Sequence, residues 1–160
     1  MFGCTVSFSN NISQAEKAVH KVTHIEQTLH NLKGTIKVDS LRKRSIDKIL
    51  NIMNKYNQTL LAQKKYAIAN EIYNMSIKYK NLDVDLICAT ITHESALTWH
   101  PEIESWAGAM GLMQIMPATG RFLSEFEGIT WTTAEEILYN PIYNIRLGSR
   151  YLAMLIATYR

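Results

Sequence analysis

Apolar residues recur three and four positions apart along the N-terminal part of the chain, which is the spacing of one face of an α-helix. Residues 12–65 hold two such stripes: Ala15, Ala18, Val22, Ile25, Leu29 and Leu32, then Ile46, Ile49, Met53, Tyr56 and Leu60. Gly34 is expected to end the first helix, and Asp39 or Ser40 to cap the second. Because each stripe is short, we predict an N-terminal helical hairpin. Its helices would pack on each other, on a protein partner or on a second copy.

The later part of the chain carries further helix signals. A helical pattern runs through residues 67–79, and Asp83 can cap a following helix with the apolar face Val84, Ile87, Cys88 and Ile91. Residues 98–116 are rich in Gly, Trp and Met and are expected to be irregular. Later helices are predicted to open at Pro117 and Pro141. Between them, a capping box is predicted from Thr132 or Thr133 with Glu135 or Glu136. No segment alternates as a strand does, so the expected fold class is mainly α.

The composition favours a folded, helical protein. Of the 160 residues 47% are hydrophobic, and most of the 7 glycines and all 3 prolines follow position 100. The net charge of +3 suits an anionic polymer such as a cell wall. No basic block is interleaved with aromatic residues, so nucleic acid is not an expected partner. No grouping of ligand residues predicts a metal site, and no cofactor is expected.

The first residues, Met1-Phe2-Gly3-Cys4, look like the end of a bacterial lipoprotein signal, in which Gly-Cys marks cleavage and lipid attachment. The charged and apolar regions of such a signal do not precede it, so a chance Gly-Cys pair is the alternative. We expect residues 1–11 to be disordered or a signal remnant. Cys88 is expected in the core, and a disulfide with Cys4 is not favoured. No stretch approaches the roughly 20 apolar residues that span a bilayer.

One carboxyl interrupts an apolar helix face. Ile87, Ile91 and Glu94 are spaced four and three apart, so they share one side of the helix. Burial and the negative end of the helix would both favour the protonated form of Glu94, which is what a general acid needs. The alternative is that Glu94 turns to solvent or pairs with a lysine. His93 points elsewhere and is expected to be a hydrogen-bonded packing residue.

The segment after Glu94 carries a long and unusual motif. Glu94-Ser95 is followed by Pro101 and Ser105, and then by the run Gly108-Ala109-Met110-Gly111-Leu112-Met113-Gln114-Ile115-Met116-Pro117. This pattern resembles the soluble lytic transglycosylase family, and a later helix of that family is resembled by Asn140-Pro141, Asn144-Ile145, Leu147-Gly148 and Tyr151-Leu152. The resemblance implies a lysozyme-like transglycosylase domain over residues 66–160.

The resemblance also implies roles for individual residues. Glu94 would be the catalytic acid and base, and Ser105 would lie near the reacting sugar. Gln114 and Met116 would line the glycan groove, and Gly108 and Gly111 would let the backbone approach the substrate. The partner would be a peptidoglycan glycan strand in the bacterial envelope, with the protein in the periplasm or lipid-anchored through Cys4. Met113 is expected to fill the core.

The implied reaction cleaves the β-1,4 bond between N-acetylmuramic acid and N-acetylglucosamine and forms a 1,6-anhydro ring. A single carboxyl suffices, whereas ordinary glycosidases use two. One alternative is a lysozyme-like hydrolase in which Glu102 or Glu104 activates water. Another is a catalytically silent protein that binds peptidoglycan or acts as a scaffold.

The chain departs from the family pattern in three places. The stretch from Ser95 to Trp99 is two residues longer than the common spacing, and Ile103 replaces a small alanine. The family's later Ala-Tyr-Asn-Ala-Gly motif does not occur before Arg160. The domain would therefore be incomplete at its C-terminal end, with an open groove wall and a better hydrated Glu94. We accordingly expect weak or absent activity from this chain alone.

Overall fold

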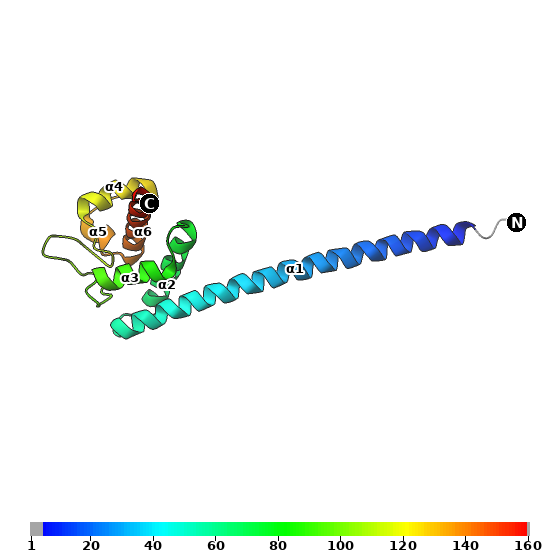
Figure 1. Ribbon diagram of the computed structural model, residues 1–160, viewed down its shortest axis with the longest axis horizontal. Coiled ribbons are helices and arrows are strands. Elements are labelled where there is room, and N and C mark those ends of the chain that lie inside the picture. Colours follow the sequence, from blue (N-terminus) through cyan, green and yellow to red (C-terminus); the bar gives the residue numbers. More distant parts are fainter. Residues whose placement is uncertain (1–4, 160) are drawn as a thin grey trace. The chain divides into compact units, whose positions relative to one another are not determined.

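The computed structural model describes the backbone of residues 5–159 and the side chains of residues 20–159. The described residues form six helices joined by turns: α1 (Thr5–Tyr56), α2 (Ala62–Lys78), α3 (Val84–Glu94), α4 (Pro117–Glu127), α5 (Ala134–Leu138) and α6 (Pro141–Thr158) (Figure 1). Within them no strand is formed, and two isolated bridges join Met110 to Glu104 and to Ile115. The predicted mainly α fold is confirmed. No described helix has both the length and the apolar character needed to cross a membrane.

The predicted N-terminal hairpin is wrong, because a single helix, α1, runs from Thr5 to Tyr56. Gly34 lies inside this helix, and a helix-interior glycine costs only about 1 kcal/mol relative to alanine. Ser40 does not cap a helix start either: its hydroxyl donates back to the carbonyl of Lys37 at 2.8 Å. The start of α1 at Thr5 also differs from the disorder expected for residues 5–11. Residues 1–4, with Cys4, lie outside the described residues.

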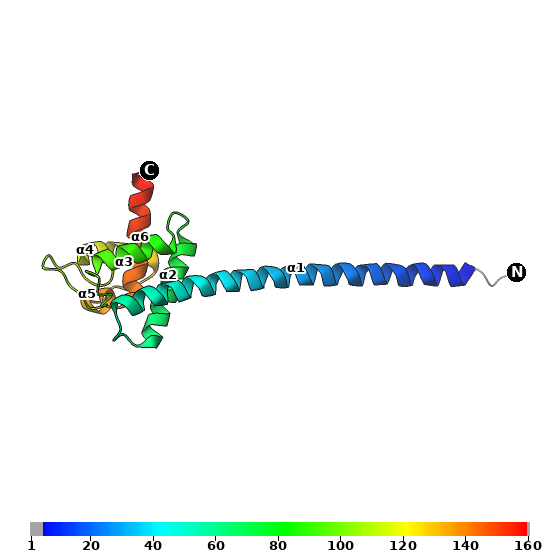
Figure 2. The ribbon, with the colours of Figure 1, turned by 60° about the horizontal axis from the view of Figure 1, so that its bottom comes forward.

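The chain divides into two units, residues 1–42 and residues 43–160. The second unit contains the end of α1 and all later helices. The second predicted stripe supplies Ile46, Ile49 and Met53 to its core, so these residues pack on the rest of the domain rather than on a hairpin partner. Within this unit α6 contacts α2, α4 and α5, and α2 also packs on α3 (Figure 2).

Most predicted helix ends after residue 60 are confirmed. Asp83 caps α3 by accepting from the amide of Leu86 at 2.7 Å, and the side chain of Thr133 accepts from the amide of Glu136 to start α5. Pro117 and Pro141 open α4 and α6 as expected. Asn140, which was not predicted as a cap, accepts from the amides of Ile142 and Tyr143. Cys88 is a free, buried thiol, and burial raises its pKa to about 12.

Candidate active site

Glu94 lines a pocket of about 200 Å³ in the second unit. The carboxyl comes from the last residue of α3, a second wall comes from the turn before α4, and a third comes from α6. The remaining lining residues are Thr90, Met113, Gln114, Ile115, Gly148, Tyr151, Leu152 and Leu155. Glu94 is the only carboxyl among them, and most of its neighbours there are apolar. The pocket therefore offers one acid/base group in a setting that also fits the ring faces of a sugar.

Glu94 lies at the rim of the pocket rather than in the core. Ile87 and Ile91 are fully buried, but the side chain of Glu94 is 41% exposed. Glu94 is thus only partly buried, because α3 ends at this residue and the next one, Ser95, already leaves the helix. The expected packing role of His93 is wrong. Its side chain is 86% exposed, and its Nδ1 lies 3.4 Å from Oε1 of Glu94.

The turn after Glu94 has an unusual backbone. Ala96, Leu97 and Trp99 have φ angles of 50°, 64° and 51°, in the left-handed region that residues with a Cβ avoid. Each such residue costs on the order of 1 kcal/mol, and backbone strain of this kind concentrates at functional sites. The strain is thus placed directly beside the candidate catalytic carboxyl.

Buried contacts of Ser95 and Trp99 hold this strained turn in place. The Ser95 hydroxyl accepts from the Trp99 amide at 3.0 Å, and the Trp99 indole donates to the Thr92 hydroxyl at 3.0 Å. The carbonyl of Trp99 accepts from the Asn57 side chain at 3.1 Å. Both Ser95 and Trp99 are fully buried. The packing of the indole therefore determines the path of the chain as it leaves Glu94.

Gln114 is the predicted groove residue that the structure brings into the pocket with Glu94. Its φ of 47° makes it the fourth residue other than glycine with a positive φ among the described ones. Its side-chain amide donates to the carbonyls of Gly111 at 2.9 Å and Ile103 at 3.2 Å. These bonds tie Gln114 to two earlier positions of the irregular segment of residues 98–116. Gln114 thus both shapes the loop and lines the pocket.

The other predicted binding residues do not line this pocket. Ser105 accepts from the amide of Ala109 at 3.0 Å, which closes a tight turn in which Gly108 has a φ of 83°. Met116 precedes α4 and is 44% exposed. Gly111 has a φ of 78°, and an added Cβ would lie 2.2 Å from the carbonyl oxygen of Leu138. Packing inside the protein therefore explains this glycine without any contact to substrate.

Asn144 fixes the pocket loop to α6, and sequence reasoning gave it no role. This fully buried side chain accepts from the amide of Met113 at 2.8 Å and donates to the carbonyls of Met110 and Leu138, both at 2.9 Å. All three of these hydrogen bonds are thus within the protein, and those to Met113 and Met110 cross 31 and 34 residues of sequence. Only the folded arrangement brings these partners together, so helical periodicity carries no signal for them.

Gly148 and Tyr151 complete the pocket from α6. A Cβ on Gly148 would lie 2.4 Å from the sulfur of Met113, so glycine is needed for α6 to approach the loop closely. Met113 is buried in the core as expected. Tyr151 is 41% exposed and lies one turn further along α6. The spacing of Gly148, Tyr151, Leu152 and Leu155 on one helix face is the signal by which this wall could have been found.

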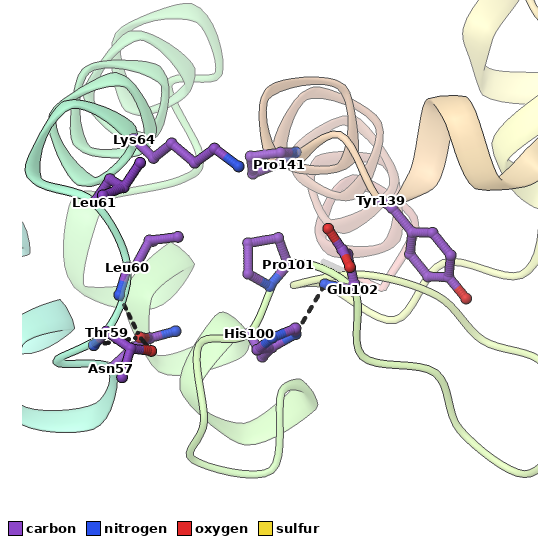
Figure 3. Close-up of a pocket in the computed structure, with 10 residues that line it drawn as sticks. All are labelled: Asn57, Thr59, Leu60, Leu61, Lys64, His100, Pro101, Glu102, Tyr139 and Pro141. Atoms are coloured by element: carbon purple, nitrogen blue, oxygen red, sulfur yellow. Dashed lines mark hydrogen bonds between the residues drawn. The ribbon is translucent and has the colours of Figure 1, made fainter.

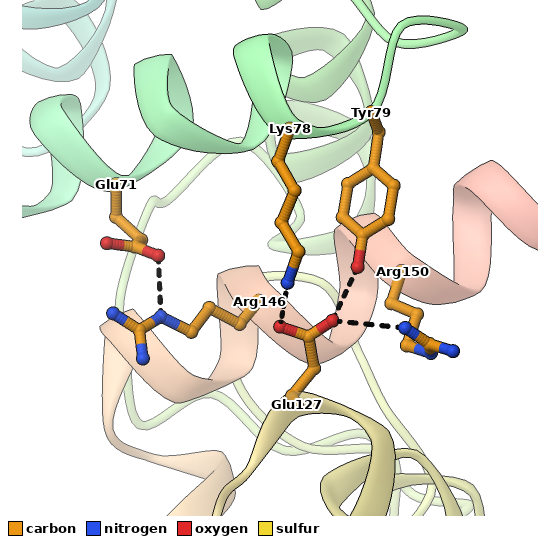
Figure 4. Close-up of polar contacts among 6 residues, drawn as sticks. All are labelled: Glu71, Lys78, Tyr79, Glu127, Arg146 and Arg150. Atoms are coloured by element: carbon orange, nitrogen blue, oxygen red, sulfur yellow. Dashed lines mark hydrogen bonds and ion pairs between the residues drawn. The ribbon is translucent and has the colours of Figure 1, made fainter.

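A buried cluster of charges fixes α6 against α2 and α4 (Figure 4). Glu127, 2% exposed, accepts from Lys78 at 2.6 Å, from the Tyr79 hydroxyl at 2.5 Å and from Arg150 at 3.4 Å. Burial alone would raise the pKa of Glu127, but the hydrogen bonds from Lys78 and Tyr79 outweigh it, so this pKa is lowered. Arg146, which lies on α6 with Arg150, donates to Glu71 of α2 at 2.6 Å. These ion pairs determine where α6 presents Gly148 and Tyr151.

The two carboxyls considered as partners for Glu94 lie elsewhere. Glu102 lines a second pocket of about 280 Å³, on the same side as Tyr139 (Figure 3). Its amide donates to Nδ1 of His100 at 3.2 Å. Glu104 accepts from the Tyr139 hydroxyl at 2.7 Å. Neither residue lines the pocket of Glu94, so that pocket supplies one carboxyl and not two.

Comparison with known proteins points to one family. Residues 71–160 match the family described as "Transglycosylase SLT domain". The chain is similar to membrane-bound lytic murein transglycosylase E of Buchnera aphidicola, with 35% identity over 106 residues, which covers 66% of this chain and 49% of the relative. It is also similar to the soluble lytic murein transglycosylase of Escherichia coli K12, with 31% identity over 91 residues, which covers 56% of this chain and 14% of the relative.

One solved structure is similar at the level of the fold and the sequence. The lytic transglycosylase Slt of Pseudomonas aeruginosa, solved as an inactive Glu-to-Gln mutant, shares 30% identity and a TM-score of 0.50. The match covers 56% of this chain and 14% of that protein. The chain thus spans about half the length of one relative and a small part of the others.

Proposed function

This chain belongs to the transglycosylase SLT family, and on that premise we propose that it is a lytic transglycosylase that cleaves the glycan strands of peptidoglycan. The observation that carries the proposal is the pocket in which Glu94 is the only carboxyl. The matched residues 71–160 include this pocket. Relatives named lytic murein transglycosylases support the same reaction and substrate.

In the proposed reaction Glu94 acts twice. As a carboxylic acid it protonates the glycosidic oxygen, and the bond between that oxygen and C1 of N-acetylmuramic acid breaks. As a carboxylate it then accepts the proton of the C6 hydroxyl of the same sugar, whose oxygen bonds to C1. The products are a strand with a free C4 hydroxyl on N-acetylglucosamine and a 1,6-anhydro-muramic acid end. No water is consumed, and Glu94 returns to its starting form.

The position of the other carboxyls supports this reaction over hydrolysis. Glycosidases that use water need a second carboxylate within roughly 5 to 9.5 Å of the first, on the other side of the scissile bond. Glu102 and Glu104 instead serve the second pocket and the Tyr139 hydroxyl. A C6 hydroxyl supplied by the substrate removes the need for such a group.

The pocket also suggests how the glycan is held. We assign Gln114 to substrate binding together with Tyr151, since both line the pocket of Glu94. Ser105, Gly108 and Met116 would contact sugars further along the strand, because they belong to the same irregular segment as Gln114. Gly111 would act indirectly, by letting the loop pack on Leu138. The substrate places the protein in the bacterial cell envelope.

Purified sacculi incubated with the full chain test this function. Mass spectrometry, which detects even the weak activity expected of this chain, should show 1,6-anhydro ends among the soluble products. Glu94→Gln keeps the size of the side chain but cannot donate and accept the proton, so it should lower product formation at least about a hundredfold, the usual range for general acid–base catalysis. Glu102→Gln and Glu104→Gln are matched controls and should retain activity.

Two outcomes would contradict the proposal. Reducing ends that disappear in Glu102→Gln or Glu104→Gln would instead show a hydrolase. Sacculi that bind the protein but release no fragments, with Glu94→Gln behaving as the wild type does, would show a binding or scaffold protein. The unfolding curve of each variant, compared with that of the wild type, shows whether the variant is folded.

A further inference from the structure

Helix α1 carries a stripe of exposed apolar side chains in the first unit. We call its five members the α1 seam, and each of them is between 51% and 67% exposed: Val22, Ile25, Leu29, Leu32 and Ile36. They follow one another at spacings of three, four, three and four residues. A row of large exposed apolar side chains at this spacing is the pattern of a coiled-coil interface.

The register of the α1 seam is regular and has a clear end. Val22, Leu29 and Ile36 take the first position of successive heptads, and Ile25 and Leu32 take the fourth. The next two positions of the row are Asp39 and Lys43, which close the seam on the C-terminal side. Gly34 falls at the outermost position of its heptad, away from the seam, with open space where its Cβ would be. The glycine therefore does not interrupt the interface.

The residues beside the seam indicate what covers it. Lys21 precedes the seam residue Val22, and Glu26 follows Ile25. When two such helices run parallel and in register, the residue before each first position faces the residue five places later on the other helix. Lys21 of one copy would then face Glu26 of the second copy, and the pair would occur twice. A second copy of this chain thus matches the seam in both apolar spacing and charge.

The narrowness of the seam argues against a lipid surface. A helix that lies on a membrane or on a globular core has an apolar face wider than about 100°. Here the flanking positions are polar, with Lys21 and Thr28 on one side and Glu26 and Lys33 on the other. A seam limited to two positions per heptad is the geometry of a two-stranded coiled coil.

We propose that two copies of this chain associate through the α1 seam as a parallel coiled coil. This proposal does not depend on the activity of the Glu94 pocket. Two of the three first positions hold Ile or Val and one of the two fourth positions holds Leu, and this combination favours parallel dimers. The two charge pairs fix the direction and the register of the helices.

Sedimentation of the full chain tests the association. The wild type should sediment as a species of twice the chain mass of 18.3 kDa. Ile25→Asp with Leu32→Asp places charges in the seam and should yield the monomer. Gln27→Asp with Asn31→Asp is the matched control on the outer face of α1 and should leave the dimer intact. Helix content, measured by circular dichroism, shows whether each variant keeps a folded second unit.

A charge exchange tests the parallel register. Lys21→Glu places two carboxylates side by side and should weaken the dimer about tenfold, which corresponds to about 1.4 kcal/mol. Adding Glu26→Lys to that variant restores both pairs in a parallel dimer and should restore the affinity. In an antiparallel dimer Glu26 faces Lys33. The double variant would then place two lysines side by side and would form a weaker dimer than Lys21→Glu alone.

Several results would overturn the proposal. The proposal fails if the wild type stays monomeric at high micromolar concentration. It also fails if the wild type forms a trimer or a tetramer. Failure of the double variant to regain affinity would reject the parallel arrangement. Sedimentation of a monomeric wild type with anionic phospholipid vesicles would show that a membrane covers the α1 seam instead.

Discussion

At the scale of single residues, the Glu94 pocket depends on Asn144, a side chain that does not line it. Asn144→Ala removes three hydrogen bonds and takes this partner from the amide of Met113 and the carbonyl of Leu138, whereas the carbonyl of Met110 still accepts from the amide of Ile115. We expect the free energy of unfolding to fall by about 3 kcal/mol, because each stranded polar group costs about 1 to 3 kcal/mol. Urea unfolding at neutral pH measures this. A loss below about 1 kcal/mol would mean that the loop is held by other contacts.

The sequence predicted the chemical centre of the pocket better than its walls. Glu94 and Gln114 belong to a local motif, and helix ends such as Asp83 and Pro117 are marked by residues whose effect is local. Asn144 binds Met113, and Gly148 packs closely against it, in a loop more than 30 residues earlier in the sequence. Helical spacing places these residues on one helix, but only the packing of the helices determines what they meet. Helical spacing left open whether Glu94 faces the core or the solvent, and the end of α3 at that residue places it at the rim.

At the scale of helices, Glu127 links α4 to α2 and α6. Its lowered pKa means that its ion pairs add stability at pH values above the ordinary 4.5 of a glutamate, and that this stability is lost as the pH falls through the lowered pKa. Glu127→Gln should therefore be less stable than the wild type at neutral pH, with the difference shrinking below pH 4.5. Urea unfolding across this range measures it. A difference that stays constant would show that Glu127 is not charged in the folded state.

The predicted hairpin and the continuous helix α1 differ in the conformation that they require of Gly34. A glycine ends a helix when its φ is positive, and the described glycines with positive φ are Gly108, Gly111 and Gly128. Gly34→Ala should therefore raise the helix content. It should also raise the free energy of unfolding of α1 by up to about 1 kcal/mol, since alanine suits a helix interior better. Circular dichroism during thermal unfolding measures both. Loss of helix content in this variant would instead indicate a turn at Gly34.

At the scale of the whole molecule, the α1 seam and the Glu94 pocket belong to different units of the chain. The seam variant Ile25→Asp with Leu32→Asp should therefore cleave short soluble glycan strands as fast as the wild type does. On intact sacculi this variant should bind about a hundredfold more weakly than the wild type, because only a dimer can engage two sites at once. Cleavage rates on the two substrates measure this. Equal losses on both would show that the pocket itself needs the dimer.

In the proposed reaction Glu94 gives one proton to the glycosidic oxygen and regains one from the C6 hydroxyl, and the substrate supplies the nucleophile. The most direct test digests sacculi in water labelled with heavy oxygen and follows the label by mass spectrometry. We predict 1,6-anhydro ends that carry no label and that are lost in Glu94→Gln. Reducing ends that carry the label would show that water attacks the sugar, and would contradict the assignment of this chain as a lytic transglycosylase.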